Sequence, residues 1–311
     1  MMTLTTLQQL IPEHQIIYYD DQQHVATLGD STALTVWYYR QPNQAATVVA
    51  GLQLGAVEET VPHLWAADVA GQLCGTPCVV VTAPHGQQLI TITEGLSHTQ
   101  LHQLGRQLGQ ILARIHLIPV AQYGNLKGGE GTPDARASLL QRITRAGHQL
   151  VAAQIASEGD ITTMCDQIMA LPMSAHYAAV LLCGDIDPAT VWVIKNGSNY
   201  RITMLSSWST ARGGWPGTEH VRVLANFAAE QWFSVRVGYG EAYDEATLFA
   251  SNHVRESALL AERLGLHMSR AAITASRGDH DSARQQWQSL LRWCAQLHPE
   301  TIFTDTKDAS A

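Results

Sequence analysis

The most constraining feature of this chain is a short apolar run, 178–183, that leads into the loop sequence Gly-Asp-Ile-Asp-Pro at 184–188. Two further β-like runs, 191–194 and 200–205, flank Lys195-Asn196-Gly197. An Asn-Gly pair between two such runs is the strongest short-range signal for a β-hairpin, because both residues accept the backbone angles of the favoured tight turns. The sequence therefore predicts a strand, a loop with two carboxylates and an antiparallel hairpin in succession.

The first part of the chain is predicted to form a small β-rich lobe with one helix. Turn signals at Asp20-Asp21 and Gly29-Asp30 separate the first three strands. The predicted strands are Gln15–Tyr19, His24–Leu28, Ala33–Gln41, Leu64–Asp68 and Cys78–Thr82, and the predicted helix is Gln44–Glu59. We expect one antiparallel sheet, followed by a hinge at the breaker cluster Ala83 to Gly86.

The remainder of the chain has mainly helical patterns. Ser97 and Gln100 have the spacing of a capping box, and apolar residues recur at helical spacing from Leu101 to Ile115. Further helices are expected at 136–154, at 162–171 and after Gly217. The fold class is therefore α+β with two lobes: residues 1–84 form an N-terminal β-rich lobe, 85–303 a C-terminal helical lobe and 304–311 a flexible tail.

Composition excludes several classes of function. The 19 Lys and Arg residues are outnumbered by 27 Asp and Glu residues, giving a formal net charge of −8, which argues against a nucleic-acid partner. The sequence has no apolar run of about 18 residues, so no membrane span is predicted. The five cysteines, which include Cys74 and Cys78, are odd in number and scattered, a pattern typical of free thiols in a cytoplasmic protein.

Several motifs follow one another in a fixed order. Leu112-Ala113-Arg114-Ile115-His116 ends the long predicted helix, and Cys183–Thr190 contains the loop with two carboxylates. Ser206-Ser207-Trp208 and then Gly214-Trp215-Pro216-Gly217-Thr218-Glu219 come after the hairpin. In order and spacing the set resembles the motifs of aminoglycoside phosphotransferases: Leu-x-x-Leu-His, His-Gly-Asp-x-x-Pro-x-Asn, Ile-Asp-Trp and Gly-Asp-Pro-x-x-Asp. The resemblance covers roughly residues 15–245 and implies a two-lobed, kinase-like fold.

The resemblance also implies roles for the loop residues. Asp185 stands at the catalytic aspartate, which takes the proton of the attacking hydroxyl. Thr190 stands at the metal-binding Asn and Ser207 at the metal-binding Asp. Asp187 stands where the family usually has His, and one interpretation is that it supplies a further carboxylate near the metal. Mg²⁺ prefers hard, usually anionic oxygens, and a hydroxyl supplies no charge. From the residues alone, Asp185 is as well explained by a loop aspartate bonded to backbone amides as by a general base, and a turn before Pro188 explains Asp187 better than a metal does.

The nucleotide-binding positions depart from the family in the same way. Arg40 stands at the third-strand lysine of the family, and no lysine precedes Lys127. Arg also binds phosphate, although a solvated arginine at a strand end is an equally open interpretation. The resemblance places Val80 and Thr82 beside the nucleotide, on the strand that enters the hinge. The glutamate that should brace the third-strand cation is absent from the middle of the helix, Ala50 to Gly55.

These departures favour a kinase-like protein that is catalytically impaired and binds a small molecule or a protein partner in the cleft between its lobes, with no cofactor. The alternative is an active ATP-dependent phosphotransferase for a hydroxyl group of a small molecule, with ATP and with Mg²⁺ held by Asp185, Asp187 and Thr190. A third possibility is a structural partner of another kinase-like chain. The first two hypotheses differ at Ser207, where an active enzyme of this design should have a carboxylate.

Overall fold

The computed structural model describes most of the chain, namely residues 3–20, 25–127, 131–132, 134–172, 178–242 and 252–296. The chain falls into two compact units, each made of two stretches. Unit 1 is Met1–Pro133 with Ala178–Asp244, and unit 2 is Asp134–Tyr177 with Glu245–Ala311. Unit 1 contains the predicted β-rich lobe together with the hairpin region, and the lobe boundary at residue 84 stays a prediction. The predicted tail, 304–311, lies outside the described residues.

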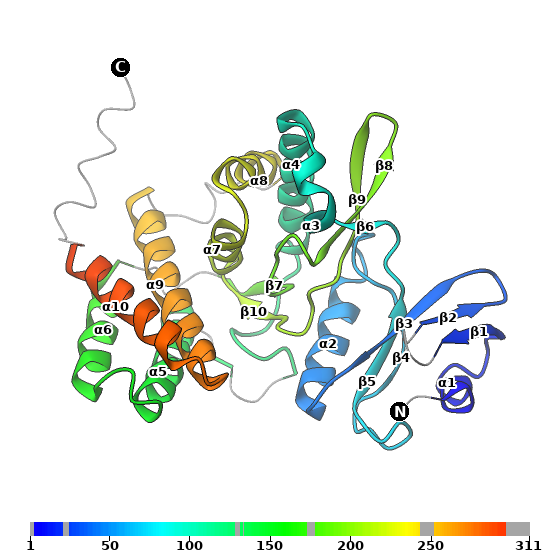
Figure 1. The fold of residues 1–311 in the computed structure, drawn as a ribbon, viewed down its shortest axis with the longest axis horizontal. Helices are drawn as coiled ribbons and strands as arrows, with labels where there is room; N and C mark the ends of the chain where they lie inside the picture. The colour runs from blue at the N-terminus through cyan, green and yellow to red at the C-terminus, as the bar shows by residue number, and fades with distance from the viewer. Residues whose placement is uncertain are drawn as a thin grey trace. The chain divides into compact units, whose positions relative to one another are not determined.

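Unit 1 begins with a five-stranded antiparallel sheet, which confirms the predicted one (Figure 1). Its strands are β1 (Ile16–Asp20), β2 (Val25–Leu28), β3 (Ala33–Tyr38), β4 (Leu64–Asp68) and β5 (Cys78–Thr82), in the order β1-β2-β3-β5-β4. Helix α1 (Leu4–Leu10), which was not predicted, contributes Leu7 to the apolar cluster that contains Leu34 and Val36 of the sheet. Alternation along the strands leaves the other face for a second helix.

That second face is covered by α2 (Pro42–Gly55), the predicted helix, which begins two residues earlier than expected and ends four residues earlier. Pro42 begins the helix because its fixed φ suits the first turn, and this start ends β3 at Tyr38. Val48 and Leu52 of α2 share one apolar core with Val79 and Val81 of β5 and with α4. The core of unit 1 therefore runs without a break from the sheet into the helices.

Helix α4 (His98–Ile115) begins at the predicted capping box, in which Ser97 and Gln100 bond each other's backbone N–H groups. Its partner in unit 1 is α8 (Ala229–Ala242), and glycines let the two backbones touch. A Cβ on Gly109 would lie 2.0 Å from the Val235 carbonyl oxygen, and one on Gly238 would lie 2.0 Å from that of Arg106. No side chain fits at either position, so both glycines are required by packing.

The predicted hairpin is present as β8 (Val191–Asn196) and β9 (Asn199–Leu205), with Gly197 at a φ of 63° in the turn. Strand β7 (Val180–Leu182) precedes it and pairs with the short strand β10 (Arg212–Gly214). The smaller elements of this region are β6 (Gln87–Gln88), which pairs with β8, then α3 (Leu89–Ile92), the 3₁₀ turn η1 (Thr93–Gly95) and α7 (Pro216–Asn226). β7, β8 and α7 thus surround the loop with two carboxylates.

Unit 2 consists of helices in the described residues: α5 (Ala135–Ala152), α6 (Glu158–Ala170), α9 (Asn252–Ser276) and α10 (His280–Gln296). Their apolar faces form a core of their own, which includes Leu139, Ile143, Met268 and Trp287. An Arg142–Glu262 ion pair, 2.7 Å between nitrogen and oxygen, joins α5 to α9. Within the described part of the chain, none of the helices is both long and apolar enough to cross a membrane.

Candidate functional site

The loop after β7 is held in a conformation that requires glycine at its first position. Gly184 has a φ of 123°, and a Cβ there would lie 2.3 Å from the hydroxyl oxygen of Thr210. That hydroxyl accepts the backbone N–H of Asp185 at 3.0 Å. The start of the loop is therefore fixed to the segment between β9 and β10, and the Asp185 side chain projects from a fixed backbone.

A buried polar cluster lies beneath the loop. Glu219 of α7 accepts the Gly184 N–H at 2.6 Å with one carboxylate oxygen, and its other oxygen lies 2.8 Å from Nε2 of His116. The second ring nitrogen of His116 lies 2.9 Å from the hydroxyl of Tyr239 on α8. All these side chains are buried. Burial, together with the Glu219 charge, also raises the pKa of the adjacent Cys183 thiol. The cluster ties the loop to the ends of three helices.

The Asp185 side chain, 53% exposed, forms an ion pair with Arg222, one turn after Glu219 on α7. Residues 188–190 follow in a tight turn built on Asp187, whose carboxylate accepts the N–H groups of Ala189 at 2.7 Å and Thr190 at 3.0 Å. The Thr190 hydroxyl donates to the Asp187 carbonyl at 2.9 Å and accepts the Asp187 N–H at 3.0 Å. The polar atoms of Asp187 and Thr190 therefore stabilise their own turn.

The structure brings Thr190 close to the segment that contains Ser207. The Ser206 N–H donates to the Thr190 carbonyl at 2.9 Å, and the Ser206 hydroxyl reaches the same oxygen at 3.2 Å. Ser207 itself is 8% exposed, and the indole of the next residue, Trp208, donates to the Leu205 carbonyl at 2.8 Å. The two predicted metal positions are thus neighbours through backbone contacts, and each has a hydroxyl side chain.

Trp208 also explains why the middle of α2 lacks an acid. A Cβ on Gly51 would lie 3.1 Å from the Trp208 ring, and one on Gly55 would lie 3.0 Å from it. The helix rests on the indole, which leaves no space there for a glutamate. The nearest acid, Glu58, instead forms a bidentate ion pair with Arg114 of α4, at 2.6 and 3.1 Å.

The three predicted nucleotide-binding residues lie in different environments. Arg40 is exposed two residues beyond the end of β3, so its assignment to the third strand was wrong, because α2 begins at Pro42. Val80 is buried in the apolar cluster on the α1 face of the sheet. The Thr82 hydroxyl accepts the indole N–H of Trp65 at 3.0 Å. The contacts of these residues do not bring them together, and their nucleotide-binding role stays a prediction.

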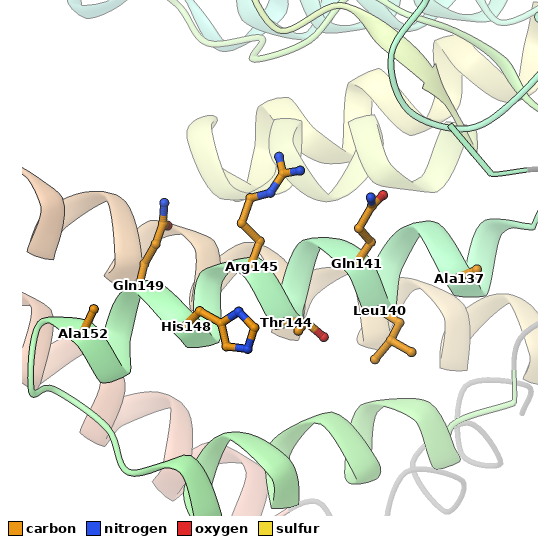
Figure 2. A pocket seen from close by; sticks show the side chains of 8 residues that line it. All are labelled: Ala137, Leu140, Gln141, Thr144, Arg145, His148, Gln149 and Ala152. Carbon is orange, nitrogen blue, oxygen red and sulfur yellow. The ribbon is translucent and has the colours of Figure 1, made fainter. Parts of the chain in front are cut away.

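In unit 2, one face of α5 lines a hollow of about 620 Å³ (Figure 2). Its lining residues are Ala137, Leu140, Gln141, Thr144, Arg145, His148, Gln149 and Ala152. Figure 2 shows their side chains projecting from a single helix, with Arg145 and His148 one turn apart along it. This lining contains basic and neutral groups and no carboxylate.

The sequence matches no family model and no curated protein. Solved structures match it along nearly its whole length. A gentamicin complex of APH(2″)-IIa has a TM-score of 0.63 at 13% identity and covers 94% of this chain and 97% of its own. A putative aminoglycoside phosphotransferase from Ralstonia eutropha has a TM-score of 0.62 at 12% identity, with 93% and 98% covered. An ethanolamine kinase from Plasmodium vivax has a TM-score of 0.58 at 9% identity, with 91% and 81% covered.

The chain has the kinase-like fold of the aminoglycoside phosphotransferases. This confirms the α+β, two-lobed fold class that the sequence predicted. Because identities of 9 to 13% show the fold alone, they assign no activity or substrate.

An aminoglycoside-phosphotransferase fold implies ATP and Mg²⁺, and a solved relative of this fold is a ternary complex with AMP-PNP and hygromycin B. The residues present here do not fit a magnesium site of that design. Asp187 and Thr190 bind their own turn, Asp185 is ion-paired with Arg222, and Ser207 has no charge. Among the residues that the structure describes, no group of three His, Cys, Asp or Glu side chains could hold a metal ion.

Glu219, Arg222 and Thr210 fix the loop, although none of them was predicted to be a site residue. Glu219 had a signal, because it stands at the last acid of the Gly-Asp-Pro-x-x-Asp motif. Arg222 and Thr210 had none, since their contacts join loop and helix positions that no sequence periodicity connects.

Proposed function

We propose that this protein binds a small molecule or a protein partner through the cleft expected between its lobes, and that its phosphotransferase chemistry is impaired. The observation that supports the proposal most is Ser207, the buried hydroxyl residue at the position where the family has a metal-binding carboxylate. Mg²⁺ on a triphosphate needs anionic oxygen ligands, which this position does not supply. A cytoplasmic location, expected from the free thiols, is part of the proposal.

The loop contacts support the same conclusion. A catalytic aspartate must have its carboxylate available to a substrate hydroxyl. The Asp185 carboxylate has Arg222 as its partner, and a substrate would have to displace that guanidinium or bind beside it. Asp187 and Thr190 would have to give up a turn held by four hydrogen bonds before either could bind a metal ion.

The α5 hollow in unit 2 has a lining that does not suit a polycationic ligand. Aminoglycosides carry several ammonium groups, and a site that binds them needs carboxylates to pair with these charges. Arg145 and His148 line the hollow instead, with amide and hydroxyl side chains around them. We therefore propose that the α5 hollow binds a neutral or anionic small molecule and not a polycationic one.

The alternative, an active phosphotransferase, has one observation in its favour. The loop that carries Asp185 is anchored by Glu219 and Thr210, and the Asp185 carboxylate is half exposed. A rigid loop with an accessible carboxylate is the arrangement that a general base requires. Two measurements distinguish these functions: nucleotide binding, and ATP consumption that depends on Asp185.

The test compares thermal unfolding of the wild type and variants with and without millimolar Mg²⁺–ATP. A ligand at 100 times its dissociation constant stabilises a fold by about 2.7 kcal/mol. We expect no shift for the wild type and a Mg²⁺-dependent shift for the double variant Ser207→Asp, Thr190→Asn. Each single change should give less, because ligands of one ion act together. Ser209→Asp, which adds the same charge at an exposed position, is the matched control and should give none.

A Mg²⁺-dependent shift of the wild type, together with ATP consumption that Asp185→Ala abolishes, would overturn the proposal in favour of the active enzyme. A folded double variant that still does not bind nucleotide would show that the losses extend beyond the metal positions, to α2 and Arg40.

A further inference from the structure

Unit 2 contains a second hollow, which is lined by residues of α9 and α10. Helices α9 and α10 lie side by side in Figure 1, and a pocket of about 420 Å³ opens between them. His267 and Arg270 of α9 line it, with Gln286, Ser289 and Trp293 of α10 opposite. The volume lies in the range of small-molecule sites, and the lining combines an aromatic ring with hydrogen-bond donors.

The pocket lining contains one arginine and one histidine, and a second arginine lies beside it. Arg263, one turn before His267, places its guanidinium 4.7 Å from the centre of the Trp293 ring, and the His267 ring meets the same indole edge-on at 5.6 Å. Burial lowers the pKa of Arg270. Burial, with the charges of Arg263 and Arg270, lowers the pKa of His267. The Arg270 charge is therefore partly removed from water, and Arg263 adds a second positive charge at the Trp293 ring.

Two carboxylates of the same helices are engaged elsewhere. Glu262 of α9 is ion-paired with Arg142 of α5, and Asp281 of α10 with Arg284. None of the residues that line the pocket is acidic. On α10, Arg292 donates to the Ser289 hydroxyl at 3.1 Å and adds a further positive charge beside the lining.

We propose that the α9–α10 pocket binds the oxyanion group of a small molecule, a phosphate or a carboxylate. Arg270 bonds the oxyanion, Gln286 and Ser289 supply further donors, and Trp293, held in place by Arg263, forms an apolar wall for the rest of the molecule. An anion offsets the positive charges of Arg270 and Arg263, and a charged hydrogen bond in a partly buried site is stronger than one at the surface. The proposal does not depend on the metal positions or on nucleotide binding.

The test is an NMR titration of the full chain at constant ionic strength, followed through the indole N–H signal of Trp293. The probes are inorganic phosphate, pyrophosphate and benzoate, with chloride as the reference anion. We expect a saturable shift with the phosphates or with benzoate, and which of them binds distinguishes a phosphorylated ligand from a carboxylate. Arg270→Gln should weaken binding roughly 10- to 100-fold, the effect of losing one charged hydrogen bond.

Arg277→Gln is the matched control, because this exposed arginine lies just beyond α9 and does not line the pocket. It removes the same charge and should leave the affinity unchanged. The absence of a saturable shift with all three probes would overturn the proposal, as would equal weakening by Arg270→Gln and Arg277→Gln, which would indicate general charge attraction. Melting curves of both variants verify that each is folded.

Discussion

The Asp185 carboxylate is ion-paired with Arg222, and the residue before it, Gly184, donates its N–H to Glu219, one turn earlier on the same helix. Helix α7 therefore contacts the loop twice, once at the backbone and once at the side chain. The two contacts differ in burial: Glu219 is fully buried, whereas the Asp185 side chain is half exposed. Their energies should differ accordingly.

Replacing Glu219 should therefore destabilise the fold strongly. Glu219→Ala leaves His116 and the Gly184 N–H without their acceptor, and breaking such a buried pair costs about 3 kcal/mol or more of the free energy of unfolding. Glu219→Gln keeps an oxygen for Gly184 and should cost less than half as much. Urea unfolding measures both. Arg222→Gln removes an ion pair in which the Asp185 side chain is half exposed although the Arg222 side chain is mostly buried, and it should cost less than Glu219→Ala. Equal losses in all three variants would contradict this account.

The contact between α4 and α8 provides a second prediction. Gly109→Ala places a methyl group against the Val235 carbonyl, so the helices must separate, at a cost of about 1–3 kcal/mol or more. Gly240→Ala, on the exposed face of α8, meets no atom within 4 Å and should stabilise by about 0.4–1 kcal/mol. Thermal unfolding of the two single variants compares them. A neutral Gly109→Ala would show that the helices are not in backbone contact.

Stability should fall in alkali because of the buried thiols. Burial raises the pKa of Cys74, Cys78, Cys165 and Cys183, and raises that of Cys294 to about 11. Unfolded thiols ionise near pH 8.5, so above that pH the folded state holds more protons and the free energy of unfolding falls as pH rises. Each thiol contributes up to about 1.4 kcal/mol per pH unit. Denaturant titrations between pH 8 and 10 give the free energy of unfolding at each pH. Its decrease with pH should be smaller for Cys294→Ala, and an unchanged decrease would contradict the raised pKa of Cys294.

The Glu58–Arg114 ion pair should make the free energy of unfolding depend on pH in the acidic range. Burial alone raises the pKa of Glu58, but the hydrogen bonds and charge of Arg114, with Thr60, outweigh it and leave the pKa below its ordinary value. The folded state therefore binds fewer protons than the unfolded state, and the stabilisation is present above about pH 4.5 and is lost as pH falls through the lowered pKa. Glu58→Gln should be less stable than the wild type at pH 6 and should lose less between pH 5 and 3. Parallel curves would contradict the prediction.

Local signals in the sequence were sufficient for most elements of the fold. Asn196-Gly197 set the turn of the hairpin, and Ser97 with Gln100 set the start of α4, because each pair acts through neighbouring residues. The short elements were missed: α1 has seven residues, and two of the three residues of β10 are glycines, which favour no strand. Strand β3 was predicted too long because the effect of Pro42 on the start of α2 was overlooked.

The candidate site was less predictable, because its contacts depend on packing. The sequence showed that a carboxylate is missing at Ser207, but not that Arg222 reaches Asp185 or that Glu58 bonds Arg114. A glycine at position 51 or 55 does not indicate from the sequence what the helix packs against. The Trp208 ring, which lies against both positions, explains why no acid stands there.

Unit 2 is made of two stretches of the chain that are synthesised at different times. Helices α5 and α6 leave the ribosome early, yet α9 and α10, which cover their apolar faces, follow only after the whole second stretch of unit 1. Unit 1 has all its described strands and helices before unit 2 is complete. In the interval Leu139 and Ile143 have no partner helix from the second stretch, so the nascent chain presents an apolar surface of the kind that chaperones bind.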